Sequence, residues 1–206
     1  MTSHITKEAF LAGLVCRTQG WRVHRAPRKA IGPGLEWRFY VGQEVGRLAQ
    51  AQLGAGVGLP VGPTTTAVAS TARAVGSPEA TMLYEASFEW QGCVARADAL
   101  RRQGDGWDLI EVKSGKSPEE ADVKDEYIDD AAYSAMVAIG AGLPVRRCFL
   151  MLIRRELRLG DGLPVLEEIE VTESGAGVGA VSVNGIVSSA SGASAVLPAL
   201  RTQTFT

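Results

Sequence analysis

Two carboxylates and one amine occur at a spacing that a single β-hairpin would bring together. Alternating apolar and polar residues predict one strand through Asp98 and a second through Glu111 and Lys113, joined by a two-residue turn at Gly104-Asp105. This turn places Asp98 directly opposite Glu111, and such opposed residues have Cβ atoms roughly 4.5–5.5 Å apart. Lys113, two residues beyond Glu111, projects from the same face. A longer turn that changed the parity would separate the pair.

Facing carboxylates repel each other unless a cation lies between them. Mg²⁺ fits this arrangement, because it is typically held by one or two carboxylates and keeps water and phosphate oxygens as its other ligands. Lys113 would then orient a water molecule or stabilise negative charge on a phosphate. The alternative interpretation is an exposed hairpin with scattered charges, since this spacing also arises by chance.

The order Asp98, then Glu111-Val112-Lys113, resembles the signature of the PD-(D/E)xK nucleases. The segments around it, including MLYEASFEWQGCVARADAL and YIDDAAYSAMVAIGAGLPV, are similar to the RecB-like branch, in particular to a poorly characterised group of bacterial RecB-type nucleases. The resemblance extends to ITKEAFLAGLVC and VGQEVGRLAQ and covers roughly the first 155 residues. It implies a Mg²⁺- or Mn²⁺-dependent deoxyribonuclease whose metal ligands are Asp98, Glu111 and the Val112 carbonyl.

The same resemblance points to further candidates around this centre. Glu44 on a helix is a candidate extra metal ligand and Glu85 on a strand a candidate active-site acid, while each is also plausible as an ordinary solvated side chain. Asp130 matches the family, and Tyr127 and Tyr133 are candidate supporting residues or simple packing residues. Relatives usually have Gln where this chain has Ser134, which weakens the expectation of full activity.

The predicted fold is α/β, with a restriction-endonuclease-like core. Its mixed central sheet combines antiparallel hairpin strands, a crossover helix and a parallel strand. We expect one RecB-like nuclease domain over residues 1–172 and a low-complexity, flexible tail over 173–206. The N-terminal part, 1–76, is predicted to hold helices from Lys7 to near Gly20, over 35–53 and over 64–75, and the sheet core to span 80–172. A helix from Pro118 and a buried strand over 148–153 complete it.

Charge and cysteine usage bear on the ligands of the protein and on its cellular compartment. The net charge of −2 gives no global argument for nucleic acid, but residues 1–50 carry eight Lys/Arg and three Asp/Glu. Within them, Arg22, Arg25, Arg28 and Lys29 are candidate phosphate contacts or a solvated face. Three distant cysteines and an N-terminus without an apolar core favour a cytoplasmic protein with reduced thiols. We expect no iron–sulfur cluster and no membrane association.

Two functional hypotheses follow from these observations. The first is a metal-dependent nuclease that hydrolyses DNA, in which a helicase or another repair or defence protein is a candidate partner. The second is a catalytically degenerate module that binds nucleic acid or a partner protein. Nothing in the sequence separates DNA from RNA or single from double strands, because backbone contacts dominate in every case. No P-loop is present, so the chain is not itself an ATP-driven helicase.

Overall fold

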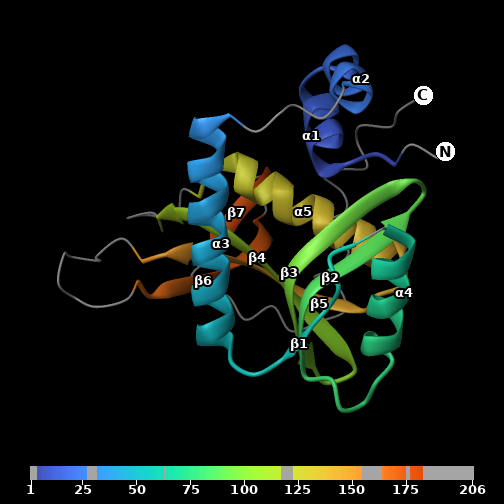
Figure 1. Cartoon of the computed structure of the whole chain (residues 1–206), viewed down its shortest axis with the longest axis vertical. Helices are drawn as coiled ribbons and strands as arrows, with labels where there is room; N and C mark the ends of the chain where they lie inside the picture. Colours follow the sequence, from blue (N-terminus) through green and yellow to red (C-terminus); the bar gives the residue numbers. More distant parts are fainter. Residues whose placement is uncertain are drawn as a thin grey trace.

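The computed structural model describes residues 4–26, 32–62, 64–116, 123–154, 164–174 and 177–182. Within these ranges the chain forms helices around one mixed sheet (Figure 1). In chain order, the elements are α1 (Lys7–Val15), α2 (Arg17–Arg25), α3 (Pro33–Leu53), β1 (Val57–Gly58), α4 (Thr64–Val75), β2 (Met82–Trp90), β3 (Cys93–Gln103), β4 (Gly106–Lys116), α5 (Asp125–Gly140), β5 (Val145–Ile153), β6 (Leu166–Ser174) and β7 (Gly177–Ser182).

The described strands form one sheet in the order β1-β2-β3-β4-β5-β6-β7. β2, β3 and β4 are antiparallel neighbours, and β5 then joins β4 in parallel after the chain crosses over through α5. This confirms the predicted α/β fold with antiparallel hairpin strands, a crossover helix and a parallel strand. β6 and β7 extend the sheet beyond the predicted core.

The C-terminal part of the chain is only partly described. β7 falls within the segment that was predicted to be a flexible tail, yet it pairs with β6 in the sheet. Residues 183–206 lie outside the described residues. The division into a domain over 1–172 and a tail over 173–206 stays a prediction.

Each face of the sheet carries its own apolar core. Leu83, Leu100, Trp107, Leu109 and Leu150 pack on the side of α4 and α5. The opposite face is covered by α3, whose Val45 and Ala49 pack on the strands there. The two helices α3 and α5 therefore enclose the sheet, with α1 and α2 at one end (Figure 1).

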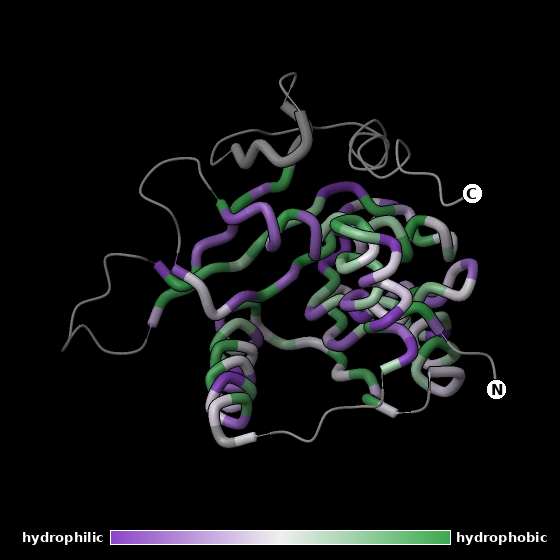
Figure 2. The backbone as a smooth tube through the Cα atoms, turned by 90° about the horizontal axis from the view of Figure 1, so that it is seen from above, coloured by the Kyte–Doolittle hydropathy of each residue, from purple (hydrophilic) through white to green (hydrophobic). Residues whose placement is uncertain are grey.

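Only the second half of α3 packs on the sheet. The helix stands to one side of the body of the molecule, with hydrophilic and hydrophobic residues mixed around it (Figure 2). Its first half leaves large side chains exposed, which are Leu35, Trp37, Phe39 and Tyr40. Phe39 is exposed because its side chain lies where the helix extends past the sheet, whereas Leu48 and Leu53 further along are half-buried.

The predicted N-terminal helix is divided in two. Thr6 caps α1 as expected, since its hydroxyl accepts a hydrogen bond from the Ala9 amide at 3.3 Å. At Cys16 the backbone is extended, and the chain turns back so that Gly20 lies against Gly13. A Cβ atom on Gly20 would lie 2.6 Å from the Gly13 Cα, so this close packing of α1 and α2 requires glycine.

Two other element boundaries fall next to residues that the structure does not describe. The helical region expected to end near Gly20 continues as α2 to Arg25, and residues 27–31 are not described. The expected start of the crossover helix at Pro118 also falls on residues that are not described, 117–122, and the described helix α5 begins at Asp125.

Candidate active site at the fork of β3 and β4

The β3–β4 hairpin opens into a fork beside Asp98. The predicted register is confirmed from the turn outward, with Gln103 opposite Gly106 and Arg102 opposite Trp107. The ladder ends at the pair Ala99–Ile110, one position before Asp98 and Glu111. There the Val112 amide donates its hydrogen bond to Asp98 Oδ2 at 2.7 Å. The carboxylate therefore replaces a backbone partner at the point where the two strands separate.

Glu85 lies at the matching position of β2 and has a strained backbone. The β2–β3 pairing includes Tyr84–Ala99 and Ala86–Ala97 but omits the position between them, where Glu85 faces Asp98. Glu85 has a φ of 63°, which costs a non-glycine residue roughly 1–3 kcal/mol. In a regular strand, Tyr84 and Ala86 would face the same side of the sheet. Here Tyr84 packs on the α3 side and Ala86 on the α5 side, so the alternation of side chains between the two faces is interrupted at Glu85. The result is that Glu85 and Asp98 both line a cleft next to α3.

Glu111 is a buried acid with an incomplete set of partners. Its side chain is 2 % exposed, and Oε2 accepts a hydrogen bond from Lys7 Nζ at 3.1 Å. Oε1 is buried and accepts no hydrogen bond of good geometry from the described residues, but the nearby Ser134 hydroxyl interacts with the carboxylate and lowers its pKa. Burial, and next the charge of Asp98, raise the pKa of Glu111 to about 7, although Lys7 and Lys113 oppose this.

Asp98 shares this electrostatic environment. Burial raises its pKa, and the charge of Glu85 adds to the rise, while the hydrogen bond from Val112 and the charge of Lys113 act in the opposite direction. Two acids that each disfavour the other's charge hold a proton or a cation more readily than isolated carboxylates. The fork therefore concentrates negative charge that no single side chain fully neutralises.

Two lysines and Asp130 surround the buried glutamate. Lys113 forms an ion pair with Asp130 and lies 3.7 Å from Glu111 Oε2. Lys7 bridges the same acids, since its Nζ also lies 3.3 Å from Asp130 Oδ2. Burial alone would lower the pKa of Lys113, but the charges of Glu111 and Asp130 outweigh it and keep the pKa above its usual value. Lys113 is therefore a cation near neutral pH, suited to stabilising negative charge rather than to accepting a proton.

Two further candidates from the sequence, Glu44 and Tyr133, make their contacts outside this cluster. Glu44 is partly exposed on α3 and forms an ion pair with Arg47, while its neighbour Gln43 lines the cleft. The Tyr133 ring is fully buried, and its hydroxyl donates to the Ile5 carbonyl at 3.0 Å, with the Val94 carbonyl 3.1 Å away. Tyr133 therefore ties α5 to the N-terminal segment and to β3.

Tyr127 and the basic residues of the N-terminal region lie outside the fork itself. Tyr127 packs against Gly115 of β4, where a Cβ atom would meet its hydroxyl at 2.6 Å. Arg22 and Arg25 are on α2, and Arg25 lies 5.3 Å from the centroid of the Trp21 ring. Arg28 and Lys29 lie outside the described residues. The phosphate-binding role of this group stays a prediction.

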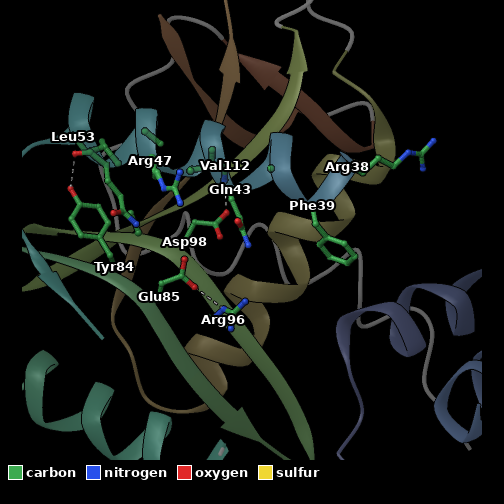
Figure 3. A pocket seen from close by; sticks show the side chains of 15 residues that line it. Arg38, Phe39, Gln43, Arg47, Leu53, Tyr84, Glu85, Arg96, Asp98 and Val112 are labelled. Atoms are coloured by element: carbon green, nitrogen blue, oxygen red, sulfur yellow. Dashed lines mark hydrogen bonds and ion pairs between the residues drawn. The ribbon is translucent and has the colours of Figure 1, made fainter. Parts of the chain in front are cut away.

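A cleft of about 560 Å³ leads to the fork (Figure 3). One wall is α3, the other is formed by β2 and β3, and Asp98 and Val112 lie between Tyr84 at one end and Arg38 at the other (Figure 3). Its lining also includes Arg38, Phe39, Gln43, Arg47, Glu85 and Arg96. Arg96 Nε lies 2.8 Å from Glu85 Oε2, which fixes the side chain of the strained residue.

The residues at the fork fit a divalent cation that retains water. Among the described residues, no group of three or more His, Cys, Asp or Glu side chains is placed to hold a metal ion. Asp98 and Glu111 instead provide two neighbouring buried carboxylates whose pKa values are both raised. This is the donor set of Mg²⁺, which binds one or two carboxylates, rather than of a metal held in an all-protein cage.

The residues that sequence reasoning missed reach the site from distant segments. Lys7 contacts Glu111 across 104 positions of sequence, so no local pattern indicated it. Arg96 was an overlooked signal, because it lies two residues before Asp98 on β3 and pairs with Glu85. Gln43 lies next to the predicted Glu44, and only the rotation of α3 against the sheet decides which of the two lines the cleft.

The raised pKa of Glu111 predicts how the metal-free protein responds to pH. Between the ordinary pKa of a glutamate and about 7, the folded protein keeps a proton that the unfolded chain releases. In EDTA, the free energy of unfolding should therefore fall by on the order of 2 kcal/mol between pH 5 and pH 8. Urea unfolding at several pH values measures this. Glu111→Gln should flatten the fall, whereas the exposed Glu126→Gln control should not; an equal fall in both variants would contradict the assignment.

Comparisons with known proteins leave the chain without an assigned family. No family model matches it, and no curated protein matches it. Among solved structures, it is similar to an alkaline exonuclease from Laribacter hongkongensis at 15 % identity and a TM-score of 0.33, over 82 % of this chain and 78 % of that one. The protein SSO0001 is similar at 14 % identity and a TM-score of 0.28, over 82 % and 71 %. Among the described residues, no helix is long and apolar enough to cross a membrane.

Proposed function

We propose that the chain is a metal-dependent nuclease whose active site is the fork of β3 and β4. One observation carries this proposal: two neighbouring buried carboxylates with raised pKa values, Asp98 and Glu111, lie close to the charged Lys113, and Asp98 also lines an open cleft. Such a cluster is costly to maintain, since like charges that are buried close together destabilise a fold. Perturbed acids of this kind, placed at a cleft, are typical of functional sites.

Each residue has a distinct role in this proposal. Asp98 and Glu111 would hold a Mg²⁺ or Mn²⁺ ion, together with the Val112 carbonyl. The ion would lower the pKa of a bound water and stabilise the charge that develops on the phosphate. Lys113 would donate to a phosphate oxygen, and Asp130 positions its ammonium group. Glu85 would line the substrate path as a further acid, and Glu44 would reach the ion only through water.

The strained conformation of Glu85 supports a role for this part of the sheet. Backbone strain inside a strand persists only where the surrounding structure enforces it, and it concentrates at functional sites. Here the strain accompanies the position at which Asp98 leaves the ladder and turns toward the cleft. The break in both strands thus presents an acid that a regular hairpin would direct elsewhere.

A cleavage assay tests the proposal. Purified protein is incubated with labelled single-stranded DNA, double-stranded DNA and RNA, in Mg²⁺, in Mn²⁺ and in EDTA. We expect cleavage of DNA in the presence of either ion and none in EDTA. Metal-independent binding without cleavage of any of these substrates would contradict it and would favour the degenerate binding module. DNA over RNA, a helicase partner and a cytoplasmic location remain predictions.

A further inference from the structure

The cleft beside α3 is lined by three arginines and by two acids, Glu85 and Asp98. Arg38, Arg47 and Arg96 lie along it, and their guanidinium groups are at least partly exposed. Arg47 and Arg96 each pair with one glutamate, whereas Arg38 projects away from α3 at the outer end (Figure 3). Guanidinium groups in this arrangement suit the phosphates of a chain that runs along the cleft toward Asp98.

Phe39 places an exposed aromatic ring in the same cleft. Its side chain is 56 % exposed and points from α3 into the space between that helix and the β2–β3 hairpin (Figure 3). Trp37, two residues earlier, is also exposed, but it lies outside the cleft and stacks on Tyr40 at 5.6 Å. An apolar ring in a cleft that is also lined by arginines is a combination that nucleic-acid bases and phosphates satisfy together.

The face of α3 that lines the cleft is partly bare backbone. Gly42 and Gly46 both belong to the lining, and a Cβ atom at either position would meet nothing within 4 Å. These glycines therefore do not serve close packing of α3 against another described element. Glycine inside a helix costs about 0.5–1 kcal/mol relative to alanine, and here it leaves the cleft open instead.

We propose that this cleft holds an unpaired nucleic-acid strand, with phosphates contacting Arg38, Arg47 and Arg96 and one base stacking on Phe39. The inference rests on the proposed function, because the cleft leads the strand to Asp98. A base within a duplex has both of its faces covered, so stacking on Phe39 selects a single strand or an unpaired end. Backbone recognition by arginines and stacking on one ring implies little dependence on base sequence.

Binding measured in EDTA separates this inference from catalysis. Fluorescence anisotropy reports the affinity for a labelled single strand of about 20 nucleotides and for a duplex of the same length. Phe39→Ala should weaken single-strand binding about 10-fold, because stacking on an aromatic side chain contributes roughly 1–3 kcal/mol per base. Trp37→Ala, which removes an exposed ring from the same helix outside the cleft, should leave the affinity unchanged.

A second variant tests the cleft by filling it. Gly46→Leu places a side chain in the open space and should stabilise α3, yet single-strand binding should fall at least about 10-fold. Single-strand binding that survives both Phe39→Ala and Gly46→Leu would overturn the inference, as would an equal loss of duplex binding. If wild-type protein cleaves DNA while these variants bind normally, the cleft assignment alone fails. If binding depends on the cleft while wild-type protein cleaves nothing, the inference stands and the proposed function fails.

Discussion

Asp98→Asn is expected to lower metal-dependent cleavage about 10³-fold, because a bound divalent ion contributes several kcal/mol to phosphodiester hydrolysis. The substitution preserves shape, and the asparagine oxygen can still accept the hydrogen bond from the Val112 amide. It also removes one of two coupled buried charges, so the metal-free protein should be at least as stable as the wild type. A loss of activity without a loss of stability is the signature of a functional residue.

The measurement combines initial cleavage rates in Mg²⁺ with urea unfolding in EDTA. Asp105→Asn is the matched control, since Asp105 lies at the turn of the same hairpin, is exposed and pairs with Arg146. This control should cleave at the wild-type rate. If Asp98→Asn cleaves as fast as Asp105→Asn, the metal centre is not at the fork. If its activity falls only in proportion to a loss of folded protein, Asp98 has a structural role.

Lys113→Met is expected to lower the cleavage rate by about 10²–10³-fold while metal binding is retained. The ammonium group of Lys113 is charged near neutral pH and lies 3.7 Å from Glu111, so it can stabilise charge that develops on a phosphate next to the ion. Methionine keeps much of the length and apolar volume of the side chain. Its introduction leaves Asp130 paired with Lys7 only, so a modest loss of stability should accompany the loss of rate.

Lys116→Met serves as the control for this prediction, because Lys116 is exposed and lies further along the same strand. Cleavage rates at saturating Mn²⁺ and calorimetric titration with Mn²⁺ separate chemistry from metal binding. We expect Lys116→Met to match the wild type in both. A Lys113→Met variant that cleaves at the wild-type rate would exclude Lys113 from the reaction, and one that loses metal binding would show that its role is to maintain the site.

The sequence was sufficient for the parts of the site that local rules control. The turn at Gly104-Asp105 determines the register of the β3–β4 hairpin, and the confirmed pair Arg102–Trp107 follows from counting outward. Alternation then places Glu111 and Lys113 on one face. Asp98 departs from this geometry, because the ladder ends before it and the left-handed backbone of Glu85 interrupts β2 opposite it. A regular strand pattern contains no signal for such a break.

Contacts between distant segments could not be predicted in this way. Lys7 reaches Glu111 only because α1 lies against α5 and β3, where the preceding Ile5 pairs with Cys93 and accepts a hydrogen bond from the Tyr133 hydroxyl. The apolar residues of α3 do not show which part of the helix is covered, since its first half extends past the sheet and leaves Phe39 exposed. Hydrophobicity alone does not say whether another element covers a side chain.

The most direct test of the metal centre is a crystal structure of the protein soaked with Mn²⁺, with the ion located by its anomalous signal. The proposed function predicts a peak between Asp98 and Glu111, within coordination distance of oxygen atoms from both carboxylates, and a displaced Lys7 side chain. If crystals of a protein with demonstrated Mn²⁺-dependent cleavage show no ion there, or show it bound elsewhere, the fork of β3 and β4 is not the metal centre.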